Sequence, residues 1–425
     1  MDVIVGGGVV GLCVAWRAAR AGLAVTVVDP APGSGASHAA AGMLAPVSEV
    51  AYTEGPLLRL GVASLSRWPA FAAELAAESG HELDLRTDGT LDVAFGADDL
   101  AVLDELATYM DKLDLPVERL TGRQCRRLEP MLAPSVRGGL LAPGDAWVDP
   151  RRVTAALLAA LERLGVPVVR ARVRELLRSG GRVAGVRLED GGRLPADRVV
   201  VAAGVSSAEL AGVPVRPVKG QIMRLRSPGP LLSRCVRGTV HGTPVYLVPR
   251  GDGELVVGAT QEELGFDTRV TAGGLYELLR DARELVPGVT ELELSDVVAG
   301  LRPGTPDNLP LIGPTRTPGL TLATGHFRAG VLLAPLTADL LMAEHIGDDG
   351  GPVEGTGPGE RAGPMGVGGP GDGAGPGDFR GHEDDRGPGN GAGPQRHEGL
   401  RDSGHRAELR ELAVLCSPER FREIS

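Results

Sequence analysis

Residues 3–29 read VIVGGGVVGLCVAWRAARAGLAVTVVD, and this stretch decides the fold. An apolar run, Val3–Val5, leads into the glycine-rich segment 6–11, and a second apolar run, Ala24–Asp29, ends on a carboxylate. Gly11–Ala21 between them has the length and the residue types of a helix. Because buried parallel strands read as continuous apolar runs, the stretch predicts a β-α-β unit with a glycine-rich first turn.

Each glycine of this GxGxxG pattern has a physical role in binding a dinucleotide. Gly6 makes the tight turn, Gly8 lets a pyrophosphate approach the backbone and the helix N-terminus, and Gly11 allows close packing of helix on strand. Asp29 is placed to bind ribose hydroxyls. NAD and FAD present the same adenosine diphosphate to such a turn, so the motif predicts a dinucleotide without distinguishing the two. A glycine-rich turn with nothing bound is the alternative.

Length and composition exclude several classes of protein. A chain of 425 residues with 42% hydrophobic residues can bury a sizeable core, and two or three domains are expected. The net charge of −11 disfavours nucleic acid as a partner. No apolar run approaches the roughly 20 residues of a membrane span, and the opening residues lack the pattern of a signal peptide. We therefore expect a cytoplasmic protein with no membrane partner.

The cysteines form neither a disulfide framework nor a metal site. Cys13, Cys125, Cys235 and Cys416 lie about a hundred or more residues apart, and no CxxC motif occurs. No metal is therefore expected. Arginine makes up 42 of the 44 basic residues, so a single arginine is weak support for a site.

The remainder of residues 1–346 mixes strand and helix patterns. Asp149-Pro150 supplies an N-cap and a first-turn proline, which predicts a helix over Arg151–Leu164. A further helix is predicted at Val331–Ile346. Strands are predicted at Val166–Val169, Arg182–Leu188, Arg193–Val201, Pro244–Pro249 and Leu320–Ala323.

Residues 347–406 differ sharply from the rest of the chain. They contain 21 glycines and 7 prolines in 60 residues and hardly any aliphatic side chains. Such a segment cannot bury enough apolar surface to offset its conformational entropy, so a disordered linker is predicted. Helical spacing returns at Ala407–Leu415, which predicts a short ordered element over residues 407–425.

Two further segments have the composition of ligand-binding loops. Small residues over 35–44 (GASHAAAGML) would let the chain lie flat against a large ligand, although an alanine-rich loop is equally expected in this composition. Residues 325–330 (GHFRAG) separate a strand from a helix, so a second helix N-terminus could face the anionic part of a flavin. A plain strand-turn-helix connection explains that segment equally well.

A candidate substrate site lies in residues 299–313 (AGLRPGTPDNLPLIG). Arg302 stands between glycines and prolines, which predicts a rigid, irregular loop whose guanidinium can bind a carboxylate with both of its terminal nitrogens. Tyr246 could donate its hydroxyl to the same carboxylate. A surface ion pair for Arg302 and a half-buried core position for Tyr246 are the alternatives.

Taken in order, these motifs resemble the D-amino-acid oxidase-like family of FAD-dependent amine oxidoreductases, and within it the bacterial branch that oxidises glycine for thiamine biosynthesis. The resemblance covers nearly all of residues 1–346 and resumes around Cys416–Phe421. The motifs that carry it are GGGVVGL, SHAAAGML, VKGQ, YLVPR, VVGAT, AGLRPGTPDNLPLIG and GHFRAGVLLAP.

The resemblance implies an α/β fold with two interleaved domains. A Rossmann-type FAD-binding domain is expected over residues 1–85, 146–218 and 297–346. A substrate-binding α+β domain on a mixed antiparallel sheet is expected over 86–145 and 219–296. The linker 347–406 is an insertion relative to the family. FAD is expected to be non-covalent, because no cysteine lies near Pro303–Asn308, where related sarcosine oxidases attach their flavin.

The resemblance also implies the site residues. Arg302 is expected to bind the substrate carboxylate, with Tyr246 as its hydrogen-bonding partner. Gln261 stands where an apolar residue would better suit a glycine-sized pocket, so the size of the substrate stays open. FAD contacts are expected at Gly6, Gly8, Val9, Val10, Gly11, Asp29, Pro30, Ala36, Ser37, Ala41, Gly42, Met43, Val173, His326, Phe327, Arg328, Ala329, Gly330, Val331 and Leu332.

The reaction implied is oxidative deamination of glycine, or of small amines such as sarcosine or small D-amino acids, to glyoxylate, ammonia and hydrogen peroxide. It would supply thiazole synthesis, with oxygen as the electron acceptor and a homo-oligomer as the assembly. No histidine lies beside Arg302 or Tyr246 in the sequence, although His241 and His326 stay open as bases. The alternatives are a D-amino-acid dehydrogenase that reduces a quinone and a non-catalytic dinucleotide-binding protein.

Overall fold

The computed structural model describes residues 1–348 and 403–424. Most of the predicted linker, 349–402, lies outside the described residues. The predicted linker bounds are wrong at both edges, because helix α10 (Gly330–Asp348) extends past residue 346 and helix α11 (Ser403–Leu415) begins before residue 407. Residues 347–348 and 403–406 contain no proline, so the backbone hydrogen bonds of both helices can continue through them.

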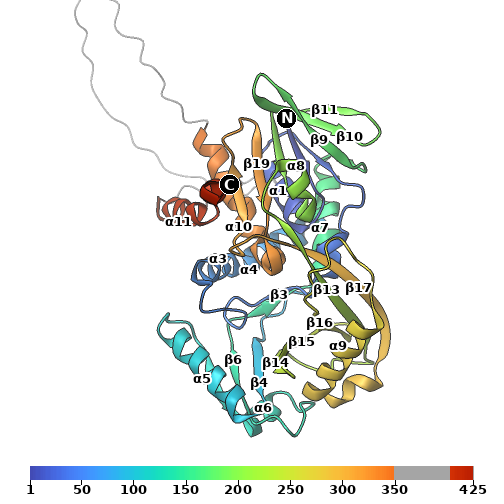
Figure 1. The fold of residues 1–425 in the computed structure, drawn as a ribbon, viewed down its shortest axis with the longest axis vertical. Helices are drawn as coiled ribbons and strands as arrows, with labels where there is room; N and C mark the ends of the chain where they lie inside the picture. The colour runs from blue at the N-terminus through green and yellow to red at the C-terminus, as the bar shows by residue number, and fades with distance from the viewer. Residues whose placement is uncertain (349–402, 425) are drawn as a thin grey trace, which may run out of the picture.

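A six-stranded sheet forms the upper part of the molecule in Figure 1, in the order β18-β19-β12-β1-β2-β8. All neighbours are parallel except β18 and β19. The predicted β-α-β unit is confirmed, with helix α1 (Val9–Arg20) between β1 and β2. The strands are β1 (Asp2–Val5), β2 (Val25–Val28), β8 (Val168–Val169), β12 (Arg198–Val201), β18 (Leu311–Pro314) and β19 (Leu320–Thr324).

Both faces of this sheet are buried, which explains its continuous apolar strands. One face packs against α1, α7 (Pro150–Arg163) and α10, together with α3 (Gly55–Leu65) and α4 (Trp68–Ser79). The predicted cap is present, since the Asp149 carboxylate accepts a hydrogen bond from the Arg151 amide. The other face packs against a small antiparallel sheet of β9 (Val173–Ser179), β10 (Arg182–Leu188) and β11 (Arg193–Pro195).

The predicted single strand Arg193–Val201 is wrong. The structure divides it into β11, which pairs with β10, and β12, which pairs with β1 in the six-stranded sheet. Pro195 lies at the end of β11, where a residue without an N–H group cannot continue the ladder. The chain therefore leaves one sheet at this proline and enters the other at Arg198.

An eight-stranded sheet forms the lower part of the molecule, in the order β17-β13-β16-β15-β14-β4-β6-β5. Its neighbours are antiparallel except β4 and β14, so the predicted mixed antiparallel sheet is confirmed. The strands are β4 (Thr90–Ala94), β5 (Glu118–Thr121), β6 (Gly138–Ala142), β13 (Arg216–Arg226), β14 (Cys235–Val240), β15 (Thr243–Pro249), β16 (Glu254–Gly258) and β17 (Glu293–Gly304).

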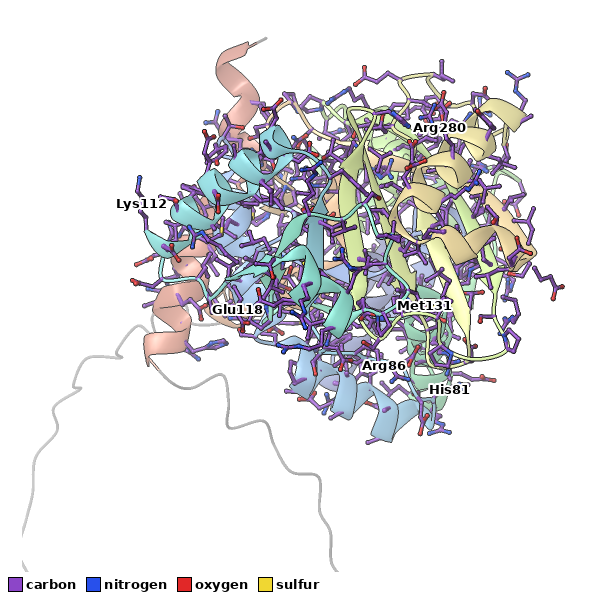
Figure 2. The ribbon with its side chains drawn as sticks, turned by 90° about the horizontal axis from the view of Figure 1, so that it is seen from below. His81, Arg86, Lys112, Glu118, Met131 and Arg280 are labelled. Atoms are coloured by element: carbon purple, nitrogen blue, oxygen red, sulfur yellow. The ribbon has the colours of Figure 1, made fainter. Side chains whose placement is uncertain are left out.

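Helices α5 (Ala97–Asp111) and α9 (Ala272–Leu285) flank this sheet at its two ends. Figure 2 views the same region from below, with Lys112 at the end of α5 projecting outward and Arg280 on α9 at the opposite side. The remaining elements are α2 (Gly35–Ala39), β3 (Met43–Leu44), α6 (Gly122–Leu128), β7 (Ala146–Trp147), η1 (Gly204–Ser206), α8 (Ser207–Ala211), η2 (Pro287–Glu291), η3 (Phe327–Ala329) and η4 (Pro418–Ile424).

The two large sheets meet around β13 and β17, which are the longest strands and run between the upper and lower parts in Figure 1. Helix α2 packs directly on β17. The C-terminal element returns to the six-stranded sheet, where the Ile312 amide donates to the Cys416 carbonyl at 2.9 Å. None of the helices within the described residues is long and apolar enough to cross a membrane.

Candidate active site

A cavity of about 1170 Å³ lies between the two large sheets. This volume exceeds the roughly 300–1,000 Å³ of sites for drug-sized ligands, so it has room for a dinucleotide together with a small substrate. The predicted residues that line it are Gly6, Gly8, Val9, Val10, Asp29, Ala36, Ser37, Ala41, Gly42, Met43, Tyr246, Gln261, Arg302, His326, Phe327, Arg328, Gly330 and Val331. The predicted FAD contacts that do not line it are Gly11, Pro30, Val173, Ala329 and Leu332.

The glycine turn is built so that α1 begins directly against the sheet. A Cβ at Gly6 would lie 2.2 Å from the Ala202 carbonyl oxygen, and Gly6 has a φ of +116°, which favours glycine. A Cβ at Gly11 would lie 2.0 Å from the Gly6 carbonyl oxygen, so Gly11 packs helix on strand and stays out of the cavity. The N-cap residue of α1 is Gly8, which has no side chain to cap the helix, and the first turn contains no acidic residue. Its positive end therefore faces the cavity and suits a phosphate group.

Two side chains hold this turn in place. Asp29 accepts hydrogen bonds from the amides of Gly7 and Ala31, both at 2.7 Å. Ser37 on α2 accepts from the Val9 amide at 2.9 Å. Because each carboxylate oxygen of Asp29 has a second lone pair, the residue can also accept from ribose hydroxyls.

Residues 39–43 line the cavity, and the neighbouring Val148 and Arg250 fix their backbone. Gly42 has a φ of +80°, and a Cβ there would fall 2.0 Å from the Val148 carbonyl oxygen. The buried guanidinium of Arg250 donates to the carbonyl oxygens of Ala41 at 2.5 Å and Val148 at 3.0 Å. Arg250 therefore aligns this segment, a role that its position in the YLVPR motif did not indicate.

The GHFRAG segment brings His326 into the cavity wall as a neutral side chain. Its Nε2 lies 2.9 Å from the Thr337 hydroxyl oxygen, and that hydroxyl donates to the Leu333 carbonyl. The Thr337 oxygen must then accept, so Nε2 carries the proton and Nδ1 carries none. Burial lowers the His326 pKa to about 3, which makes the ring a poor base at neutral pH. His241 is exposed and does not line the cavity.

Arg302 does not lie in an irregular loop, so this part of the prediction is wrong. It belongs to β17, where Val218 of β13 is its register partner. The antiparallel ladder with β13 continues through Pro303 because a proline at the free edge of a sheet loses no inward hydrogen bond. The backbone of Arg302 is thus held rigidly, as predicted, but by a paired strand and not by a loop.

The Arg302 guanidinium packs against the backbone of β13 at Gly220. A Cβ at Gly220 would fall 2.3 Å from its Nη1. The same nitrogen donates to the carbonyl oxygens of Thr260 at 3.2 Å and Lys219 at 3.4 Å. These bonds to neutral acceptors leave the positive charge of Arg302 without a carboxylate partner within 4 Å among the described residues.

Tyr246 meets Arg302 in the cavity. Its ring lies over Gly258, where a Cβ would be 2.5 Å from the hydroxyl oxygen. Burial raises the pKa of Tyr246 to about 12, against the opposing effect of the positive charge and hydrogen bond of Arg302. A neutral phenol and a guanidinium therefore lie together, and both can donate to one carboxylate.

Several cavity residues were missed by sequence reasoning. Gln221 of the VKGQ motif binds the segment 260–274 that covers the cavity, since its carboxamide donates to Glu262 at 2.8 Å and accepts from the Thr271 amide at 2.8 Å. Glu49 and Arg237 also line the cavity. Neither has a local sequence signal, because Arg237 reaches this site through the register of β14 and Glu49 through the loop that follows β3.

The residues that line the cavity, as well as its volume, suit a flavin dinucleotide. Glycines at 6, 8, 42 and 300 keep the wall open where side chains would fill it or collide with the neighbouring backbone. The α1 N-terminus supplies the phosphate end, and the segment 39–43 with His326 supplies a flat, largely neutral region at the other end. The site residues therefore match the chemistry of a bound dinucleotide and an adjacent carboxylate.

A model of the family described as FAD dependent oxidoreductase (DAO) matches residues 3–344. The chain is 36% identical over 353 residues to a glycine oxidase of Geobacillus kaustophilus, which covers 81% of this chain and 92% of that protein. It is 36% identical over 341 residues to the bifunctional protein ThiO/ThiG of Nostoc sp., which covers 80% of this chain. This chain spans about half the length of that relative, 51%.

Solved structures agree with these relatives. The crystal structure of glycine oxidase from Geobacillus kaustophilus superposes with a TM-score of 0.76 at 34% identity, covering 82% of this chain and 94% of that one. The crystal structure of iminodiacetate oxidase from Chelativorans sp. superposes with a TM-score of 0.74 at 27% identity, covering 82% of this chain and 95% of that one. The fold of this chain is therefore the fold of these oxidases.

Proposed function

This chain belongs to the DAO family of FAD-dependent oxidoreductases, and from that premise we propose that it deaminates glycine oxidatively to glyoxylate and ammonia while reducing oxygen to hydrogen peroxide. The observation that carries the proposal is the pair of Arg302 and Tyr246. Both donors lie in the cavity that begins at the glycine turn of α1. A small amino acid bound by its carboxylate there would lie next to the cofactor.

FAD, when bound, supplies the acceptor for the hydride that leaves the amino acid and passes the electrons on to oxygen. The residues that would hold its adenosine diphosphate are Gly6, Gly8, Asp29 and Ser37, and those that would hold its ring system are 41–43 and 326–331. The absence of a cysteine over Pro303–Asn308 supports non-covalent binding.

The protein's own residues bind and orient the substrate. The Arg302 guanidinium and the Tyr246 hydroxyl take the carboxylate, which fixes the direction of the α-carbon. A substrate held in this way loses less freedom in the transition state, so orientation is the main contribution of the chain to the rate. His326 has a pKa of about 3 and is not placed to remove a proton at neutral pH. The amine therefore has to bind in its neutral form.

The relatives support the finer points of this proposal. Proteins named glycine oxidase match over about four fifths of this chain and more than nine tenths of their own length. The relative named ThiO/ThiG supports a place in thiamine biosynthesis, where the product would supply thiazole synthesis. Gln261 lines the cavity and adds a polar carboxamide to its wall, so substrates somewhat larger than glycine belong in the test.

The test is a spectral titration of the purified holoenzyme. Adding one equivalent of glycine without oxygen should bleach the visible FAD absorbance and yield one equivalent each of glyoxylate and ammonia. Admitting oxygen should then restore the absorbance with one equivalent of hydrogen peroxide. If glycine leaves the spectrum of FAD-loaded protein unchanged, the proposal is wrong. Sarcosine and D-alanine in parallel titrations define the size limit of the substrate.

A further inference from the structure

A second guanidinium lies next to Tyr246 on the cavity side of the eight-stranded sheet. Residues opposite one another in neighbouring strands place their side chains on the same face. Arg237 of β14 is the register partner of Tyr246, and Asp92 of β4 is the register partner of Arg237. The complete row across the sheet is Val298, Ile222, Gly258, Tyr246, Arg237, Asp92, Leu140 and Arg119.

One nitrogen of Arg237 has no partner. Its Nε lies 3.4 Å from Asp92 Oδ2, which orients the planar group. Its Nη1 is buried and makes no hydrogen bond to any of the described residues. A buried N–H group without an acceptor is costly, and native proteins rarely leave one unless a ligand or water completes it. Because Arg237 lines the cavity, a ligand there can complete it.

A carboxylate, Glu49, lines the cavity together with the two guanidinium groups. Glu49 acts electrostatically on both Tyr246 and Arg237. Within residues 1–348 and 403–424, its carboxylate makes no hydrogen bond and no ion pair of 4 Å or less. The cavity is therefore lined by two guanidinium groups, Arg302 and Arg237, and by the carboxylate of Glu49. Arg237 is paired with Asp92 through Nε, and its Nη1 stays open to a ligand. A molecule of complementary charge has two carboxylates with an amine between or beside them.

We propose that Arg237 binds a second carboxylate of the substrate, so that the preferred substrates are amino acids with two carboxylates. This inference rests on the proposed amine oxidation at Arg302 and names its substrate class. The first carboxylate binds Arg302 and Tyr246, and the second accepts hydrogen bonds from Nη1 of Arg237. Neighbouring strands are about 4.8 Å apart, so Arg237 lies one such step beyond Tyr246, within reach of a short dicarboxylic amine.

The second carboxylate could be attached to the nitrogen or to the α-carbon. Iminodiacetate carries it on the nitrogen, whereas D-aspartate and D-glutamate carry it on the side chain. These three compounds and glycine are assayed with the holoenzyme at several concentrations, and kcat/KM is compared. We expect at least one dicarboxylate to exceed glycine, and the compound that does so identifies the point of attachment.

The variants Arg237→Gln and Arg237→Lys test the residue itself. Losing a desolvated charge-assisted pair is expected to lower the ratio of kcat/KM for the dicarboxylate over glycine by about 30-fold or more, and lysine should restore part of it. The double variant Arg237→Gln with Asp92→Asn avoids leaving Asp92 buried without a partner and should show the same loss of ratio. The matched control is Arg283→Gln, an exposed arginine on α9, which should leave the ratio unchanged.

The outcomes separate this inference from the proposed function. If the wild-type enzyme oxidises glycine but no dicarboxylate better than glycine, or if Arg237→Gln lowers kcat/KM for both substrates equally, the inference is wrong while the function stands. If glycine is not oxidised at all, calorimetric titration with succinate and acetate still tests the site. Tighter binding of succinate that Arg237→Gln abolishes supports it, and equal affinity of both anions overturns it.

Discussion

The guanidinium of Arg302 lies against the backbone of Gly220, so close that a Cβ at residue 220 would fall 2.3 Å from Nη1. The two residues are far apart in the sequence and meet because β13 and β17 pair in antiparallel register. Gly220 thus leaves the space on β13 that the Arg302 guanidinium occupies beside Tyr246. The VKGQ and AGLRPG motifs therefore contribute residues to the same cavity.

Gly220→Ala should displace Arg302 while leaving the dinucleotide turn intact. We expect KM for glycine to rise at least about tenfold, because each factor of ten corresponds to about 1.4 kcal/mol of lost binding. Steady-state kinetics and FAD content measure the two effects. Gly144→Ala is the control, since Gly144 is exposed and a Cβ there meets no atom within 4 Å. Unchanged kinetics in Gly220→Ala would contradict the geometry.

Arg302→Ala should raise KM for glycine far more than it lowers FAD occupancy. Losing a desolvated charge-assisted pair costs about 2–5 kcal/mol, or roughly 30-fold to several-thousand-fold. Arg302→Lys keeps the charge but loses the two parallel N–H donors, so an intermediate KM is expected. Kinetics that stay within about threefold of wild type would remove Arg302 from the substrate site.

FAD should leave the protein on denaturation. The wall of the cavity offers no cysteine over Pro303–Asn308, and all four cysteines are buried elsewhere in the structure without a disulfide. Acid precipitation should therefore release a yellow chromophore into the supernatant, and absorbance measures the fraction released. Flavin that stays with the precipitate would show a covalent bond.

The stability of the protein should depend on pH through His326. Its pKa is about 3 in the folded state and near 6.5 in the unfolded state, so the unfolded chain binds one more proton between these values. Stability from this group is complete above pH 6.5 and falls as the pH drops toward 3, by about 1.4 kcal/mol per unit. Urea unfolding at pH 7 and pH 5 should show a loss about 2 kcal/mol larger in wild type than in His326→Gln. Equal losses would contradict the assignment.

Arg420→Ala should loosen the C-terminal element. The guanidinium pairs with Asp307 at 2.7 Å and donates to the carbonyl oxygens of Leu309 at 2.5 Å and Pro310 at 2.9 Å. Losing these bonds should cost about 1–3 kcal/mol, measured as a fall in Tm. Arg316→Ala is the control, because its side chain is 74% exposed and its surface pair with Glu419 should contribute less than about 1 kcal/mol. A similar fall in both variants would argue against this role.

The sequence alone determined the dinucleotide half of the protein. The GxGxxG turn, the apolar strands around it, Asp29 and the Asp149-Pro150 helix start are local patterns, and local patterns are read directly from residue order. Fifteen of the twenty residues expected to contact FAD line the cavity near these elements or near the GHFRAG segment, with His326, Phe327 and Arg328 among them. The predicted ends of the strands were less accurate. The single strand predicted over Arg193–Val201 is two strands in two different sheets, and the first of them ends at Pro195.

Only the tertiary structure decided the substrate half. Arg302 was expected in an irregular loop, yet it lies in a strand, because pairing with β13 outweighs the turn preference of glycine and proline around it. Arg237 and Glu49 carry no local signal, since Arg237 is one of 42 arginines and reaches the cavity through strand register, and Glu49 reaches it through a loop. Register is set by the sum of many cross-strand contacts, so it becomes visible only when all the strands are in place.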